Sequence, residues 1–146
     1  MAFNTGYLED PSQVLAGTLF GGAHVILSEP TFENGLKVGR FAKLDSGSLD
    51  NLDGGANPVI AGVVVRNVAG AVEDGQTIDA AYRSFADYAR AGLVAVDVKS
   101  GETPAYGGAV YADNATGEAT ATDTDEATNG EFVKELASGL WLIRLK

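Results

Sequence analysis

The chain has a single histidine, His24, and an imidazole is the side chain that most often serves as base or metal ligand near neutral pH. It lies in an apolar run, and metal sites built on imidazoles use two or three of them. A serine nucleophile would need an activating turn, but no Gly-x-Ser-x-Gly motif occurs, and Ser46 and Ser48 lie among turn formers. We therefore expect a structural histidine and no catalytic residue.

Two groups of carboxylates could in principle bind Ca²⁺: Asp45, Asp50 and Asp53 before Gly54-Gly55, and Asp123, Asp125 and Glu126. The first group lacks the alternating ligands and the final bidentate Glu of an EF-hand loop, and for the second group solvated loop charge is the expected interpretation. The glycine-rich stretches lack the spacing of phosphate-binding and dinucleotide-binding loops. The sequence thus predicts solvated loop charge, with no metal site and no cofactor.

Aromatic side chains offer the other candidate chemistry, the stacking of sugar rings. The rings that could form such a face are those of Tyr82, Phe85, Tyr88, Tyr106, Tyr111 and Trp141. Large rings in a small β domain mostly serve the core, so we expect burial for them. A carbohydrate-binding or adhesin-like module remains the alternative to a protein-binding function.

Charge and composition narrow the possible partners of the 146-residue chain. Its net charge of −10 and pI near 4.3 predict repulsion from nucleic acid and from anionic membranes. The stretch Val14–Leu27 is too short to span a bilayer, and Met1–Gln13 holds no Lys or Arg, unlike a signal peptide. We expect a soluble, unprocessed chain that binds neither nucleic acid nor membrane.

The arrangement of apolar runs predicts an all-β fold, a β-sandwich or jelly-roll-like domain with at most one short helix. Residues 1–13 read as an extended N-terminal arm and residues 14–146 as a single β domain, in which the 19 glycines of the chain serve turns and bulges. Strands are expected at Ala23–Ser28, Leu36–Leu44 (one face buried), Val59–Val68 (central), Leu93–Lys99 (half-buried), Glu131–Leu136 and Gly139–Leu145.

Three further segments carry less regular patterns. Thr77–Ala91 fits a short helix and also a strand that leads into Leu93. Gly107–Asp113 and Glu118–Thr122 flank Asn114–Gly117, which predicts a hairpin with a four-residue loop. The polar, acidic stretch Thr122–Gly130 is expected to be an exposed loop.

The order of these features resembles the capsid cement, or decoration, proteins of tailed bacteriophages. The similarity covers roughly Leu36 to the C-terminus and is a pattern of strands and glycines. The segments that carry it are the polar arm, Leu36–Phe41, Val59–Val65, Tyr88–Val96, Pro104–Tyr111 and Gly139–Leu145.

This resemblance implies a structural virion protein, not an enzyme, that binds the outer capsid surface and cements the lattice of the major capsid protein. It also implies self-association as a homodimer or homotrimer. A protein that binds only the assembled shell stabilises it by mass action. From expected exposure, we assign its contacts to the arm and to the loop tips at Ser46–Pro58 and Asn114–Gly117, with the candidates Phe3, Tyr7, Leu8, Leu49, Leu52, Asn114 and Thr116.

Overall fold

The computed structural model describes residues 15–31, 35–65, 77–78 and 85–146, and within these ranges the chain is all-β, with no helix. The all-β prediction is therefore confirmed, whereas the predicted arm lies outside the described residues. The strands are β1 (Val25–Pro30), β2 (Leu36–Lys37), β3 (Phe41–Asp45), β4 (Ser48–Asn51), β5 (Val59–Val64), β6 (Thr77–Ile78), β7 (Phe85–Asp97), β8 (Ala109–Ala112), β9 (Ala119–Thr120), β10 (Glu126–Ala137) and β11 (Leu140–Leu145).

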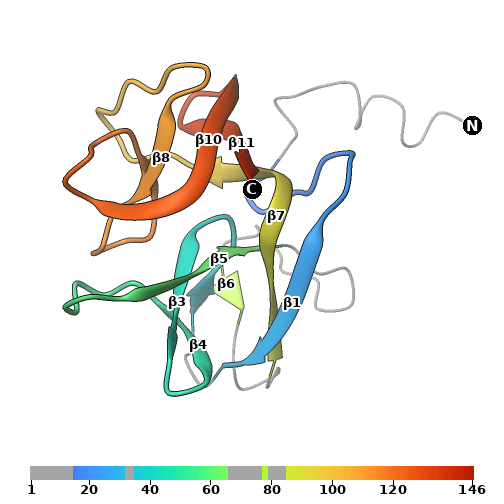
Figure 1. The fold of residues 1–146 in the computed structure, drawn as a ribbon, viewed down its shortest axis with the longest axis vertical. Coiled ribbons are helices and arrows are strands. Elements are labelled where there is room, and N and C mark those ends of the chain that lie inside the picture. Colours follow the sequence, from blue (N-terminus) through green and yellow to red (C-terminus); the bar gives the residue numbers. More distant parts are fainter. Residues whose placement is uncertain (1–14, 32–34, 66–76, 79–84) are drawn as a thin grey trace, which may run out of the picture.

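A nine-stranded antiparallel sheet contains all of the described strands except β2 and β6, which pair with each other. Its main path runs β4-β3-β5-β7-β11-β10-β8-β9, and β1 joins it by pairing with β7. At 13 residues β7 is the longest strand, and it pairs with β1, β5 and β11 along its length. Figure 1 shows β7 running from the group around β3, β4 and β5 to the group around β8, β10 and β11.

Two apolar clusters form the core, and β3, β5 and β7 contribute side chains to both. The larger contains Phe41, Phe132 and Ile143 and receives Val94 and Val96 from β7. The smaller contains Leu36, Val38, Leu49 and Val64 and receives Ala86 and Tyr88 from the first half of β7. Because β7 supplies both clusters, it holds together a fold consistent with the predicted β-sandwich.

The segment Leu36–Leu44, predicted as one strand with one buried face, is divided into β2 and β3 by a turn at Gly39. Gly39 has a φ of +81°, and a Cβ there would lie 2.2 Å from the Cβ of Ala16, so the backbone can pass only as glycine. Beyond the turn, Phe41 packs in the larger cluster and Ala42 in the smaller one. The prediction of a single buried face was wrong because β3 lies between both cores.

The segment Leu93–Lys99 was predicted as half-buried, but Val94, Ala95 and Val96 are all fully buried within β7. This part of β7 is covered on both faces. The alternation of valine and alanine therefore reflects the size of the space on each face and not a difference in exposure. Upstream, residues 85–91 are strand and not helix, while 79–84 lie outside the described part of the chain. The loop predicted at Thr122–Gly130 ends early, because β10 begins at Glu126.

The hairpin predicted around Asn114–Gly117 is confirmed, with Ala112 paired to Ala119 and Tyr111 to Thr120. The C-terminal strand β11 is also tied into the sheet as expected, between β7 and β10. The predicted central strand is β5, which pairs with β3 and β7 and whose Val63 and Val64 are fully buried.

Gly117 closes the β8–β9 loop against β3, and its replacement tests how tightly the two are packed. Gly117 has a φ of +76°, and a Cβ there would lie 2.4 Å from the carbonyl oxygen of Phe41, whose amide donates a hydrogen bond to the Gly117 carbonyl. Gly47 has a similar φ of +82° with open space around it.

We predict that Gly47→Ala costs about 1 kcal/mol of unfolding free energy, from the left-handed backbone alone. Gly117→Ala should cost about 2 kcal/mol more, because the β3 backbone must also shift. Urea denaturation of both variants measures this difference, and equal costs would show that the loop is not packed on β3.

Candidate interaction surfaces

The loop-tip candidates Leu49 and Leu52 are buried, so the exposure on which their selection rested is absent. Ser46 and Gly47 both have positive φ and form a two-residue turn between Asp45 and Ser48, so the chain returns at once as β4. Strand alternation then directs Leu49 into the smaller cluster. Sequence reasoning took this segment for a loop because its many turn formers concealed a short strand.

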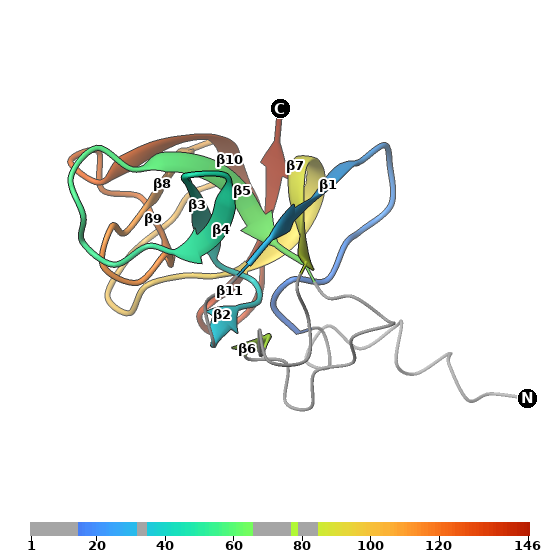
Figure 2. The same cartoon turned by 90° about the horizontal axis from the view of Figure 1, so that it is seen from below.

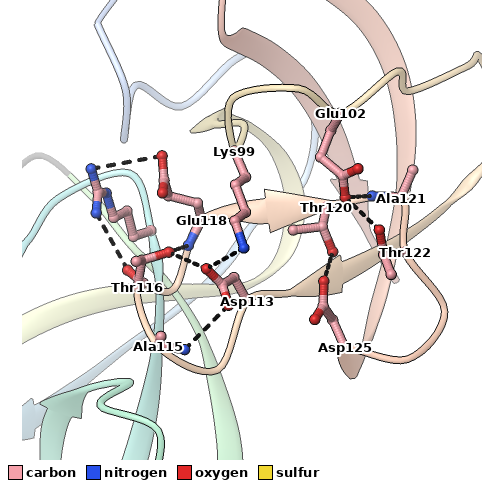
Figure 3. A network of polar contacts seen from close by, with 11 residues as sticks. Lys99, Glu102, Asp113, Ala115, Thr116, Glu118, Thr120, Ala121, Thr122 and Asp125 are labelled. Atoms are coloured by element: carbon pink, nitrogen blue, oxygen red, sulfur yellow. Dashed lines mark hydrogen bonds and ion pairs between the residues drawn. The ribbon is translucent and has the colours of Figure 1, made fainter.

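Asn114 and Thr116 lie in the β8–β9 loop, where their polar atoms bind the protein itself; Figure 3 shows the contact of Thr116. The Thr116 hydroxyl donates to Asp113 Oδ2 at 2.8 Å. The side-chain amide of Asn114 donates to the main-chain carbonyl of Gly55 at 2.8 Å, and the main-chain carbonyl of Asn114 accepts from the main-chain amide of Gly54 at 2.8 Å. Asn114 therefore joins the loop before β5 to the loop after β8, whereas Thr116 binds within its own loop. Both side chains are half-buried.

Asp113 is the centre of this loop junction, which we define as residues 53–55 and 113–118 together with Arg40 and Lys99. Its carboxylate accepts from Thr116 and from the Ala115 amide and lies 3.2 Å from Lys99 Nζ. Arg40 lies across the junction, 3.3 Å from Asp97 and 3.9 Å from Glu118. The junction is thus held by charged pairs that are partly buried, with the Asp113 carboxylate the most enclosed of these groups.

The carboxylates near β9 are also engaged in local contacts. Glu102 accepts hydrogen bonds from the Ala121 amide and from the Thr122 hydroxyl, and Asp125 accepts one from Thr120 at 2.6 Å (Figure 3). In the other acidic group, Asp53 accepts from Lys43 at 2.9 Å. Within the described ranges, no three His, Asp or Glu side chains are grouped as metal ligands.

His24 lies where the chain passes over β7. Its Nε2 is 3.2 Å from the carbonyl oxygen of Leu93, and a Cβ added at Gly92 would lie 2.3 Å from its ring. Gly92 has a φ of +113° at the point where β7 leaves β1 and begins to pair with β11. The histidine ring packs against Gly92 of β7, which is consistent with the structural role expected from the sequence.

The aromatic residues do not form one exposed face among the described residues. Tyr88 is buried, and Trp141 packs edge-on against Phe132 at 5.4 Å between ring centroids. The exposed rings, Phe85 and Tyr106, come from the start of β7 and from the loop before β8, two separate parts of the fold. Tyr82 lies outside the described ranges, and the rest of the set gives no sugar-stacking platform.

Strand β1 presents an exposed apolar surface that the sequence reasoning identified as a strand but not as a site. Val25 is 48% exposed, Ile26 38% and Leu27 39%. The signal in the sequence was three consecutive large apolar residues with no alternation, which a half-buried strand would not show.

The arm candidates Phe3, Tyr7 and Leu8 lie outside the described residues. No described helix is long and apolar enough to cross a bilayer.

The pKa of Asp113 makes the loop junction testable. Burial raises this pKa, but the hydrogen bonds from Thr116 and Ala115 and the Lys99 ammonium outweigh it, so the net pKa lies below the ordinary value. The ionised carboxylate therefore stabilises the fold fully above the unfolded-state pKa of about 4, and this contribution is lost as the pH falls through the folded-state pKa.

We predict that Asp113→Asn lowers the unfolding free energy at pH 7 by about 2 kcal/mol, because Lys99 and the loop lose a charged acceptor. The deficit should begin to shrink below about pH 4 and disappear as the pH falls through the lowered folded-state pKa, where the wild-type carboxyl also takes up a proton. Asp123→Asn, the same change at an exposed position, is the control and should have almost no effect. A deficit independent of pH would contradict the role of the Asp113 charge.

Comparisons with known proteins relate this chain to a protein family and to a solved structure. A family model described as structural cement protein (E217 gp24/Pam3 gp6) matches residues 3–146, which include most of the predicted arm. A chain in the solved capsid of Myoviridae phage XM1 is 30% identical, with a TM-score of 0.78, and the match covers 91% of this chain and 90% of that one. A search of curated protein sequences found no match.

Proposed function

The chain belongs to the structural cement protein family and is a capsid-stabilising structural protein of a phage virion; from this premise we propose that it binds the outer surface of the shell across neighbouring copies of the major capsid protein. The observation that carries the proposal is the family match over residues 3–146, supported by 30% identity to a capsid chain over nearly the full length. The chain associates with capsid proteins and acts there without catalysis.

Stabilisation follows from binding equilibria. A protein that binds the assembled shell more tightly than its separate subunits lowers the free energy of the shell by RT ln(1 + [L]/Kd) for each site. An interface of about 800 Å² per partner is an ordinary specific contact, and symmetry repeats it over the particle. A modest affinity for each copy therefore adds up to a large effect on the whole shell.

The charge of the chain supports a position outside the shell. With a net charge of −10, the protein would be repelled by packaged DNA. The charged groups of the loop junction pair with one another, so the capsid contact would draw on the arm, on main-chain groups and on apolar side chains. A further element of the proposal is self-association, which would let one cement unit contact several capsid subunits.

We predict that the purified protein co-sediments with expanded capsids that lack it and raises their melting temperature in a concentration-dependent way. Calorimetry of capsids with added protein measures this shift. A glycan array run in parallel should be blank. Absence from the capsid pellet, at concentrations above those in an infected cell, would contradict capsid binding.

We predict that deletion of residues 1–13 weakens capsid attachment at least about tenfold, as expected if an extended arm adds a strand to a neighbour or lies along it. The domain itself should keep its unfolding midpoint. Joint substitution of Phe3, Tyr7 and Leu8 by alanine should reproduce the loss. Tyr106→Ala, which removes an exposed ring elsewhere, is the matched control. Unchanged binding of the deletion variant would refute the arm contact.

A further inference from the structure

Three consecutive residues of β1, Val25, Ile26 and Leu27, form an apolar stretch that we call the β1 strip. Each is more than a third exposed. Because adjacent residues of a strand point to opposite faces, the strip exposes apolar side chains on both faces of the sheet. A partner that covers one face alone would leave half of the strip in water, so contact along the strand edge fits it better.

The outer edge of the strip is available among the described strands, since β1 pairs only with β7. The C-terminal end of β1 approaches β4, whereas the N-terminal end of the strand lies farther from it (Figures 1 and 2). Exposed edges are usually protected by lysine, proline or a bulge. The strip has neither of these residues, Pro30 comes only at the end of β1, and the bulge beside Val25 and Ile26 lies in β7, where Arg90 is skipped.

We propose that the β1 strip is the self-association surface of this protein, pairing edge to edge and antiparallel with β1 of a second copy about a two-fold axis. The inference rests on the proposed function, in which the cement unit is a homo-oligomer, and it identifies the surface and the symmetry. The same edge of both copies is used, as an isologous interface requires.

The sequence of β1 is self-complementary in one register. Antiparallel ladders pair residues with like hydrogen-bond orientation, so a strand that meets itself pairs positions whose numbers have an even sum. With Ile26 on the axis, Ile26 meets Ile26 and Val25 meets Leu27 of the second copy. A shift of the axis to Leu27 would place Val25 against Glu29. Only the register centred on Ile26 matches all three apolar residues with one another.

Electrostatics favours the same arrangement. Each copy carries a net charge of −10, so two copies approach most easily where the surface is uncharged. Glu29 follows the strip on β1, and Asp87 and Arg90 lie on the paired strand β7. With Ile26 on the axis, Glu29 lies opposite Ala23 of the second copy, so no two carboxylates are directly opposed across the strands.

Cysteine cross-linking tests the register directly, because the natural chain contains no cysteine. In Ile26→Cys the two thiols would face each other with Cα atoms about 4.5–5.5 Å apart, within the range a disulfide spans. Diamide should therefore convert the full-length variant to a disulfide dimer at least about tenfold faster than Leu27→Cys, whose thiols would be diagonal and out of reach. Val59→Cys, an exposed position on β5 with 62% exposure, is the control for random collision.

Sedimentation velocity gives the second readout. The wild-type protein should sediment at twice the chain mass of 15.0 kDa. Ile26→Lys, which would place two ammonium groups at the axis, should raise the dimer dissociation constant at least about 100-fold while its melting temperature shows that it stays folded. A wild-type monomer or trimer, or cross-linking of Ile26→Cys no faster than that of Val59→Cys, would overturn the proposal.

Capsid binding, measured separately by co-sedimentation, distinguishes this inference from the proposed function. If the wild type binds capsids but does not dimerise through Ile26, the strip inference fails and the cement function stands. If it dimerises through Ile26 but never binds capsids, the cement function fails and the strip inference stands. If it is monomeric and Ile26→Lys abolishes capsid binding, a capsid segment occupies the strip, and the second copy is refuted as its occupant.

Discussion

The structure depends on one constraint, the burial of β7 on both faces while it pairs with three other strands. Its first half supplies Tyr88 to the smaller cluster, and its second half supplies Val94 and Val96 to the larger one. A strand can change partners in this way only where its backbone can bend, and Gly92 provides that bend beneath His24. Each cluster contains only part of the core. Because both clusters hold side chains of β7, loss of packing in one is expected to weaken the other.

Much of the fold could be predicted because strand signals are local. The β8–β9 hairpin and the apolar C-terminal strand were found from turn residues and from period-two patterns. Burial was missed for Ala95 because an alternation of large and small apolar side chains resembles an alternation of buried and exposed ones. It was missed for Phe41 because the period-two pattern placed this ring on the same face as Lys37 and Lys43. Leu49 was misplaced for the opposite reason, since a four-residue strand among aspartates and glycines carries too few apolar positions to be recognised.

The candidate contact residues were harder to predict than the class of protein. Composition directed the prediction towards a protein-binding surface, and the family match identifies a structural virion protein. Exposure of single residues, however, depends on pairings between segments far apart in the chain. Asn114 binds Gly55 and Asp113 binds Lys99, contacts that no local pattern contains. The apolar run in β1 was visible in the sequence, but only the sheet order shows that it lies at an edge.

The ladder between β7 and β11 also sets how the protein bears mechanical load. Six consecutive residue pairs, from Leu140 with Asp97 to Leu145 with Gly92, join these strands in antiparallel register. A pull along β7 shears this ladder, so its hydrogen bonds share the force and must break together. A pull on the short strand β9, which has only two such pairs with β8, would peel them one after the other. The protein therefore resists the swelling of a shell under internal pressure best when the tension in the shell runs along β7.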